Sequence, residues 1–375
     1  MNIGIEATSA MESQKTGVGY YASNVIRAMT ALPDAPHTYS LYVRHHSPDP
    51  LELGKSSPSQ VMVKVLTFPC LWAQLRLPFE LWRHPQTVYF FPSSVIPLAY
   101  QPENSVVTVH DVAFLFFQDC FSPLLRHWLT IATEQSVRRA RKVIAVSEAT
   151  RQDVLAHYGV NPEKVITVHH GVHEQFRPLP SETVNTMKRT YSLDRPYILC
   201  VGTLQRRKNI PRLLHAFYLL KQKYHLPHIL VLVGQKSRDL PENEIFSTCD
   251  RLSLHQDILW TGYVGSEEMP LLMNGAELFV LPSLYEGFGM PVLEAMACGT
   301  PVACSNISSL PEVVGESGLT FDPYRVESIT ETLYHALTHP ELRRELRERG
   351  FERAAHFSWQ RCAQSTLAVL ESVGA

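Results

Sequence analysis

Two glutamates eight positions apart flank a glycine-rich segment in the second half of the chain. Glu286 and Glu294 lie in the string Tyr-Glu-Gly-Phe-Gly-Met-Pro-Val-Leu-Glu, which follows an apolar run. Gly287 and Gly289 allow a tight turn, and the proline favours a helix over Pro291–Cys298. The free N–H groups at the start of that helix form an anion site. A helix N-terminus that binds phosphate, flanked by two carboxylates that accept sugar hydroxyls, suits a nucleotide sugar. The alternative interpretation of this segment is a capped helix with acidic residues on the surface.

This segment resembles the paired-glutamate signature of retaining glycosyltransferases of family 4, which have the two-domain GT-B fold. The resemblance implies that Glu286 contacts the hydroxyls of the donor sugar. It implies that Glu294 holds the ribose hydroxyls of the nucleotide. Backbone groups of the intervening residues would then lie near the sugar and the diphosphate, namely those of Gly287, Phe288, Gly289 and Met290.

A basic loop follows an earlier strand pattern of the same half. Arg207 and Lys208 come after Gly202 and resemble the first strand and loop of the family's nucleotide domain, while Arg206 is a weaker match. The resemblance implies that these cations neutralise the donor diphosphate. Cations fixed beside a leaving diphosphate stabilise the transition state more than the ground state. Thr203 stands where many members carry arginine, so we expect one cation fewer; a solvated loop is the alternative.

A glycine loop near the N-terminus has two interpretations. Gly17 and Gly19 open a helical pattern and resemble the family loop that approaches the donor phosphate and the acceptor. With Ala22 they also fit a dinucleotide fingerprint, but about ten residues separate them from the first strand, whereas a dinucleotide loop follows its strand directly. The next strand pattern, Tyr39–Val43, ends at Arg44 instead of an acid. NAD is therefore disfavoured, and an NADP oxidoreductase remains a rival.

Five further residues match family segments. His110 follows a core strand pattern, and the resemblance places it beside the donor sugar; a buried structural histidine is the alternative. Asp111 either caps the next segment or touches the acceptor. Ser147 lies on the acceptor side and is expected to cap the following helix. Val264 resembles the lining of the base pocket. His170 stands where members often have asparagine, and its role stays open.

The predicted activity is hexosyl transfer with retention from a nucleotide-diphosphate sugar, by front-face substitution. The expected catalytic residues are His110, Glu286, Arg207 and Lys208. No cofactor or metal is expected, because the sequence has no Asp-x-Asp loop and cations with helix dipoles can hold the diphosphate. The similarity to mannosyl- and rhamnosyltransferase-like members makes GDP-mannose the first expected donor. The expected acceptor is a glycan, a glycolipid or a small molecule of cell-surface polysaccharide or lipopolysaccharide synthesis. A GT-B sugar-nucleotide epimerase and a catalytically silent binding module are further rivals.

The alternation of strand and helix patterns predicts an α/β protein with two doubly wound, Rossmann-like domains facing each other across a cleft. We expect an acceptor domain over residues 1–175, a linker over 176–196 and a nucleotide-sugar domain over 197–356. The last segment, 357–375, is expected to be a helix that crosses back to the first domain.

Composition narrows the class further. The 375 residues carry a net charge of −2, which argues against a nucleic-acid binder. Seven scattered cysteines without a Cys-x-x-Cys pair indicate a reduced, cytoplasmic protein. We expect neither a signal peptide nor a transmembrane helix. The segment Leu71–Trp82 mixes tryptophan with arginine; it either contacts the inner face of a membrane peripherally or packs into the first domain, with Pro78 as a kink.

Overall fold

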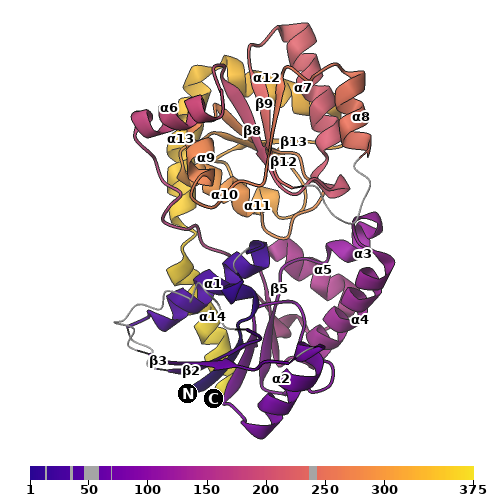
Figure 1. The fold of residues 1–375 in the computed structure, drawn as a ribbon, viewed down its shortest axis with the longest axis vertical. Helices are drawn as coiled ribbons and strands as arrows, with labels where there is room; N and C mark the ends of the chain where they lie inside the picture. Colours follow the sequence, from indigo (N-terminus) through magenta and orange to yellow (C-terminus); the bar gives the residue numbers. More distant parts are fainter. Residues whose placement is uncertain (13–14, 34–36, 46–58, 69, 236–242) are drawn as a thin grey trace. The chain divides into compact units, whose positions relative to one another are not determined.

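The computed structural model describes residues 1–12, 15–33, 37–45, 59–68, 70–235 and 243–375. The chain divides into two compact units. Unit 1 contains Met1–Leu115, Pro123–Gly171 and Phe357–Ala375, and unit 2 contains Phe116–Ser122 and Val172–His356. The last helix of the sequence thus belongs to unit 1 (Figure 1).

Unit 1 is built on a seven-stranded sheet in the order β3-β2-β1-β4-β5-β6-β7, with every pairing parallel. The strands are β1 (Asn2–Glu6), β2 (Thr38–Val43), β3 (Gln60–Val65), β4 (Val88–Phe91), β5 (Ser105–Val109), β6 (Lys142–Ala145) and β7 (Val165–Thr167). The helices are α1 (Gly17–Thr30), α2 (Trp72–Arg83), α3 (Ala113–Phe116), α4 (Pro123–Arg139), α5 (Glu148–Tyr158) and α14 (Trp359–Gly374).

The main core of unit 1 joins α1 and α14 to the middle of the sheet. Apolar residues of α1 recur at helical spacing, as in Ala22, Ile26 and Met29, and all three are fully buried. Leu367 and Leu370 of α14 pack into the same cluster as Ile3 and Phe90 of the sheet, so α14 completes this core.

Unit 2 is built on a six-stranded parallel sheet in the order β10-β9-β8-β11-β12-β13. Its strands are β8 (Tyr197–Val201), β9 (Ile229–Val233), β10 (Ile258–Gly262), β11 (Leu278–Leu281), β12 (Val302–Ser305) and β13 (Leu319–Phe321). The helices are α6 (Ser181–Thr190), α7 (Ile210–Tyr224), α8 (Asn243–Arg251), α9 (Met269–Gly275), α10 (Met290–Ala297), α11 (Leu310–Val314), α12 (Val326–Thr338) and α13 (Pro340–Ala355).

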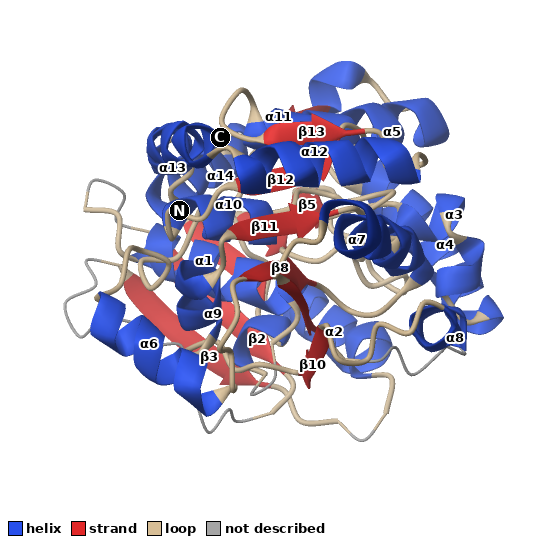
Figure 2. Cartoon of the chain, turned by 90° about the horizontal axis from the view of Figure 1, so that it is seen from above, coloured by secondary structure: helices blue, strands red, loops and turns tan. Residues whose placement is uncertain are grey.

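The strand order of each sheet reverses direction at one place. In unit 1 this place lies between β1 and β4, and in unit 2 it lies between β8 and β11. Figure 2 shows β8 and β11 as neighbouring strands. Open parallel sheets bind ligands beyond the carboxyl ends of the strands at such a reversal. The loops that follow β8 and β11 are therefore the first place to look for a site in unit 2.

The expected alternation of strands and helices is confirmed, and with it the α/β class with two Rossmann-like sheets. The segment expected as a plain linker instead contains α6, whose Val184 and Met187 are buried one helical turn apart. The segment around Pro78 forms α2 with the proline inside the helix. No helix within the described residues is both long and apolar enough to span a membrane.

Candidate active site

The loops after β8 and β11 bring Lys208 and Glu286 together in unit 2. Lys208 ends a short 3-10 turn, Arg206–Lys208, and Glu286 lies five residues beyond the end of β11. The Lys208 ammonium donates to Glu286 Oε1, and Arg207 Nη1 lies 3.3 Å from Glu286 Oε2. Lys208 and Glu286 are each only 8% exposed. The sequence-predicted catalytic residues of this half therefore form one buried cluster at the sheet reversal.

Three serines hold the Glu286 loop in place. Ser283 Oγ donates to Glu286 Oε1 at 2.6 Å. Ser308 and Ser309, which follow the neighbouring strand β12, donate to the Glu286 backbone carbonyl at 2.6 and 2.9 Å. Arg207 Nη1 also donates to the Tyr285 carbonyl at 3.1 Å. Loops after three adjacent strands thus fix Glu286, two of them at its carboxylate and the third at its backbone carbonyl.

Charge decides the protonation state of Glu286. Burial alone would raise its pKa, but the charges of Lys208 and Arg207 outweigh burial. Hydrogen bonds from Lys208 and Ser283 add to this effect, and the pKa of Glu286 falls to about 2. Glu286 is a carboxylate at neutral pH. Burial lowers the pKa of Lys208, although the Glu286 carboxylate opposes this shift.

Helix α10 begins directly after this loop. Gly289 is its N-cap with φ +102°, a backbone conformation that L side chains rarely adopt, and a Cβ there would lie 2.7 Å from Leu310 Cδ2. Pro291 occupies the first turn, as expected. Gly287 and Phe288 are buried between Glu286 and the helix, and Met290 is its first residue. The predicted helix N-terminus beside Glu286 is therefore present.

Glu294 lies one turn inside α10. Burial raises the pKa of its carboxyl to about 7. Among the described residues its side chain has no hydrogen-bond or ion-pair partner, in contrast to Glu286. Its two oxygens are available to accept hydroxyl groups when the carboxyl is ionised.

The other residues predicted on the donor side of unit 2 differ in how they lie relative to the Lys208–Glu286 cluster. A Cβ at Gly202 would lie 3.3 Å from Lys208 Nζ, so the ammonium group lies against this glycine. Thr203 is exposed in the same loop. The exposed Arg206 pairs with Asp119 at 3.1 Å, outside the ion pairs of Glu286 with Lys208 and Arg207. Val264 is buried after β10.

His110 is the corresponding candidate in unit 1. It follows β5, and its Nε2 donates to the Pro92 carbonyl oxygen at 2.7 Å. Because a carbonyl can only accept, this bond places the proton on Nε2. Burial lowers the pKa of His110, although the Pro92 carbonyl and Asp111 oppose the shift. The neutral ring then presents Nδ1 as an acceptor.

Two rings, those of Tyr21 and His170, contact His110, and Trp359 packs against both of them. The His110 ring lies edge-on to Tyr21 at 4.8 Å and 5.7 Å from His170, and Trp359 stacks on His170 at 5.8 Å. Burial lowers the pKa of His170 well below its usual value, and His110 and His169 add to the shift. A Cβ at Gly171 would lie 2.1 Å from the Trp359 backbone nitrogen. The start of α14 is thus packed against the end of the β7 segment, which explains the buried His170.

Two acceptor-side candidates have structural explanations. Asp111 Oδ1 accepts from the Ala113 N–H at 3.0 Å, so the capping alternative is observed. Ser147 is fully buried and accepts from the Thr150 N–H at 3.0 Å as the N-cap of α5. Gly17 and Gly19 begin α1 as predicted, and a Cβ at Gly19 would lie 2.7 Å from the Ser9 carbonyl oxygen. The site residues that sequence reasoning missed are Ser283, Ser308 and Ser309; their position just after parallel strands was the available signal.

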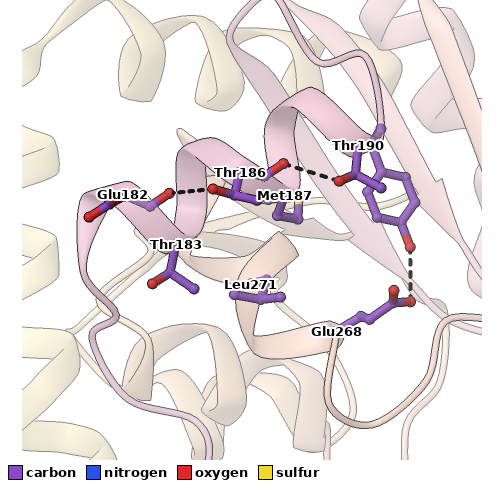
Figure 3. A pocket seen from close by; sticks show the side chains of 8 residues that line it. Glu182, Thr183, Thr186, Met187, Thr190, Glu268 and Leu271 are labelled. Atoms are coloured by element: carbon purple, nitrogen blue, oxygen red, sulfur yellow. Dashed lines mark hydrogen bonds between the residues drawn. The ribbon is translucent and has the colours of Figure 1, made fainter.

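The described residues also line a cavity away from these groups. It lies between α6 and α9 and is lined by Thr186, Met187, Tyr191, Glu268 and Leu271, among others (Figure 3). Tyr191 Oη donates to Glu268 Oε2 at 3.1 Å across it. No group of three or more metal-ligating side chains is found in the part of the chain that the structure describes.

Comparisons with known proteins identify the family of this chain. The family model for glycosyl transferases group 1 matches residues 185–353, and the model for Glycosyltransferase Family 4 matches residues 16–176. The O-antigen chain mannosyltransferase B of Escherichia coli is 31% identical over 293 residues, which cover 78% of this chain and 76% of that protein. The serotype-specific mannosyltransferase WbdA of Escherichia coli is 31% identical over 72% of this chain, and the match spans 34% of its length.

Solved structures confirm the fold. Sucrose-phosphate synthase from Thermosynechococcus elongatus superposes with a TM-score of 0.75 at 19% identity, covering 100% of this chain and 99% of that one. Anabaena Alr3699/HepE, solved in complex with UDP and glucose, gives a TM-score of 0.76 at 16% identity, covering 99% and 100%. Two Rossmann-like sheets of this kind form the GT-B fold. With both family models matched, the chain belongs to glycosyltransferase family 4.

Proposed function

We propose that this glycosyltransferase moves mannose from GDP-mannose to a glycan acceptor with retention of configuration and without a bound metal. The observation that carries the proposal is the buried cluster of Lys208, Arg207 and Glu286 at the β8–β11 reversal. The mannosyl donor is supported by two similar proteins of Escherichia coli that are named mannosyltransferases.

Donor binding begins with an exchange of anions. The diphosphate takes the place of the Glu286 carboxylate beside Lys208 and Arg207, because two phosphate charges attract these cations more strongly than one carboxylate. The N–H groups at the start of α10 donate to the same diphosphate. The displaced Glu286 carboxylate then accepts hydroxyl groups of the sugar. Glu294 accepts the ribose hydroxyls.

Transfer follows on the face from which the diphosphate leaves. The bond from the anomeric carbon to the phosphate oxygen breaks, and the electron pair stays on GDP, where Lys208 and Arg207 stabilise the added charge. The acceptor oxygen forms the new bond on that same face, and its proton passes to the departing phosphate oxygen. His110 orients the sugar through Nδ1. These steps need no metal, since fixed cations balance the leaving group.

The proposed acceptor is a lipid-linked glycan of O-antigen or a related cell-surface polysaccharide. This assignment rests on the name of one relative, an O-antigen chain mannosyltransferase of Escherichia coli, whose match covers 78% of this chain. The proposed location is the cytoplasm, at the inner face of the membrane.

The test is a panel of GDP-mannose, UDP-glucose, UDP-N-acetylglucosamine and dTDP-rhamnose, each assayed for thermal stabilisation and release of nucleoside diphosphate, with and without EDTA. The proposal expects stabilisation and GDP release with GDP-mannose, insensitive to EDTA and lost in Lys208→Ala. Activity only with another nucleotide sugar would overturn the donor, and loss of activity in EDTA would overturn the metal-free mechanism. Donor conversion to an epimer without acceptor would favour the epimerase class. Stabilisation by NADPH alone would return the glycine loop at Gly17 to a dinucleotide role.

A further inference from the structure

The cavity between helices α6 and α9 of unit 2 has no part in the proposed transfer of the sugar. Its volume is about 410 Å³, within the range of about 300–1,000 Å³ that is usual for small-molecule sites. Its lining consists of three threonines, two glutamates, a tyrosine and two apolar side chains, and includes neither Lys208 nor Glu286. The cavity is therefore separate from the catalytic cluster in its residues.

The two helices that form the walls are fixed to each other. Asn274 of α9 accepts the Leu179 N–H at 2.9 Å, which ties the chain just before α6 to α9. Within the helices, a Cβ at Gly275 would lie 3.0 Å from Met187 Cε, so this glycine lets α9 approach α6 closely. The cavity is thus preformed, and a ligand need not order its walls on binding.

Three exposed threonines of α6 face the cavity. Thr183, Thr186 and Thr190 are three and four residues apart, which is the spacing of one helix face. The Thr186 hydroxyl donates to the Glu182 carbonyl oxygen at 3.0 Å, and the Thr190 hydroxyl to the Thr186 carbonyl oxygen at 3.1 Å (Figure 3). Arg189 donates to Thr186 Oγ1 at 3.2 Å, which leaves that oxygen one lone pair. Because both hydroxyl hydrogens are used within the helix, these oxygens can only accept hydrogen bonds from a ligand.

A carboxylate adds further acceptors to the lining. Tyr191 Oη donates to Glu268 Oε2 at 3.1 Å, so the phenol hydrogen is also used within the protein. Partial burial and this bond to the carboxylate raise the pKa of Tyr191, which keeps the hydrogen on the phenol. The charge of Glu268 repels anions such as phosphates. The lining therefore suits a ligand that carries no negative charge and is rich in hydrogen-bond donors.

Two side chains give the cavity an apolar surface. Met187 is buried in α6 and Leu271 is half-buried in α9, and both line the cavity. A hexose presents hydroxyl donors around its edge and C–H groups on its faces, so it matches both the acceptors and this apolar surface. A metal ion or a polyamine would use the acceptors alone.

We infer that this cavity is a second glycan-binding site, which holds a short stretch of a neutral oligosaccharide. The oxygens of Thr186, Thr190 and Glu268 accept its hydroxyl groups, while Met187 and Leu271 pack against a C–H face of a sugar ring. The choice of sugar rests on the proposed function, because a transferase that extends a mannose-containing glycan meets that glycan as acceptor and as product. A site apart from the catalytic cluster can hold the chain between successive transfers.

The test is a calorimetric titration of the full chain with α-linked mannotetraose in the absence of any nucleotide. We expect saturable binding that Thr186→Val and Glu268→Gln each weaken about threefold to tenfold. Tyr191→Ala should weaken it about tenfold or more. Tyr324→Ala, which removes an exposed tyrosine elsewhere in unit 2, should bind like the unmodified chain, and so should Lys208→Ala.

Thr186 and Glu268 are exposed, so their variants should keep the melting temperature and the release of GDP from donor even where Tyr191→Ala loosens α6. The titration needs no donor, so a failure of the proposed transfer leaves its outcome readable. Absence of binding would overturn the second site, as would binding that is equal in all the cavity variants, which belongs elsewhere on the chain. Binding of spermine but not of mannotetraose, weakened by Glu268→Gln, would assign the cavity to a cation instead.

Discussion

Glu286 holds the ammonium group of Lys208 in a buried ion pair, although the two residues lie 78 positions apart in the sequence. Each comes from a loop beyond one of the two strands that flank the reversal of the unit 2 sheet. The carboxylate therefore occupies the place beside the Lys208 ammonium that the donor diphosphate would take in the proposed function.

The proposed replacement of the Glu286 carboxylate by the donor diphosphate predicts opposite effects of a Glu286 substitution on binding and on catalysis. Glu286→Gln removes the anion that competes for Lys208 and Arg207, so the affinity for GDP should rise about threefold to tenfold while kcat falls about 100-fold or more. The variant should also be about 2–4 kcal/mol less stable without ligand, because it leaves buried cations uncompensated. Calorimetric titration, thermal unfolding and GDP-release kinetics measure the three effects. Ser283→Ala, which removes only one hydrogen bond, is the control, and weaker GDP binding by Glu286→Gln would contradict the exchange.

Glu294 predicts a pH dependence near neutrality. Its folded-state pKa of about 7 lies above the ordinary 4.5, so the folded protein binds the proton more tightly than the unfolded chain does. The resulting cost in stability is absent below pH 4.5, develops as pH rises and is complete above pH 7. Since the side chain is partly exposed, we expect about 1–3 kcal/mol. Glu294→Gln should therefore raise the free energy of unfolding at pH 8 and change it little at pH 5.

The same titration should affect the donor. An ionised carboxyl accepts the ribose hydroxyls, so affinity for the nucleotide sugar should rise about tenfold from pH 6 to pH 8. The rise should vanish in Glu294→Gln. A nucleotide sugar is the appropriate probe, because its diphosphate does not titrate in this range. An equal pH dependence in both proteins would remove Glu294 from the ribose site.

Trp359 predicts a positioning effect on His110 within unit 1. Trp359→Ala removes the ring that stacks on His170 and should cost about 3 kcal/mol of stability. It should lower kcat about tenfold and leave the Kd for the donor unchanged, because the donor cluster lies in unit 2. The indole N–H is buried without a hydrogen-bond partner among the described residues, so Trp359→Phe should recover most of both losses. A purely structural role would lower stability in Trp359→Ala without lowering the kcat of the folded fraction.

A substitution at Ser147 distinguishes a role as a helix cap from a role in binding the acceptor. Ser147→Ala should cost about 1 kcal/mol of stability through the lost cap of α5, with the KM for acceptor unchanged. Ser358→Ala removes the equivalent cap of α14, where Ser358 Oγ accepts from the Arg361 N–H at 3.2 Å, and serves as the matched control. A rise in acceptor KM confined to Ser147→Ala would show that the hydroxyl contacts the acceptor.

Most of the fold could be predicted because its signals are local. Buried parallel strands such as Ser105–Val109 and Leu278–Leu281 are short apolar runs between turn residues. The strand expected over Tyr39–Val43 is β2, which begins one residue earlier, and the helix expected over Pro291–Cys298 is α10, shifted by one residue. Helix α6 was missed because its pattern is mostly polar, with only Val184 and Met187 buried.

The residues of the candidate site likewise divide into those that local sequence patterns could indicate and those that they could not. Glu286, Lys208 and His110 could be selected from the sequence because each stands in a short motif that follows a strand pattern, and their roles stay predictions. Ser308 and Ser309 were missed, because their contact with Glu286 depends on which strands are neighbours in the sheet. The stacking of Trp359 on His170 joins positions separated by most of unit 2, and no local pattern predicts it.

The position of α14 has a consequence for how the chain is made. Unit 1 needs Leu367 and Leu370 of this helix to close the core around Ile3 and Phe90. A ribosome releases residues 357–375 only after all of unit 2 has emerged. The nascent chain therefore carries an open apolar face on unit 1 while unit 2 is synthesised, and this interval is when it depends most on chaperones.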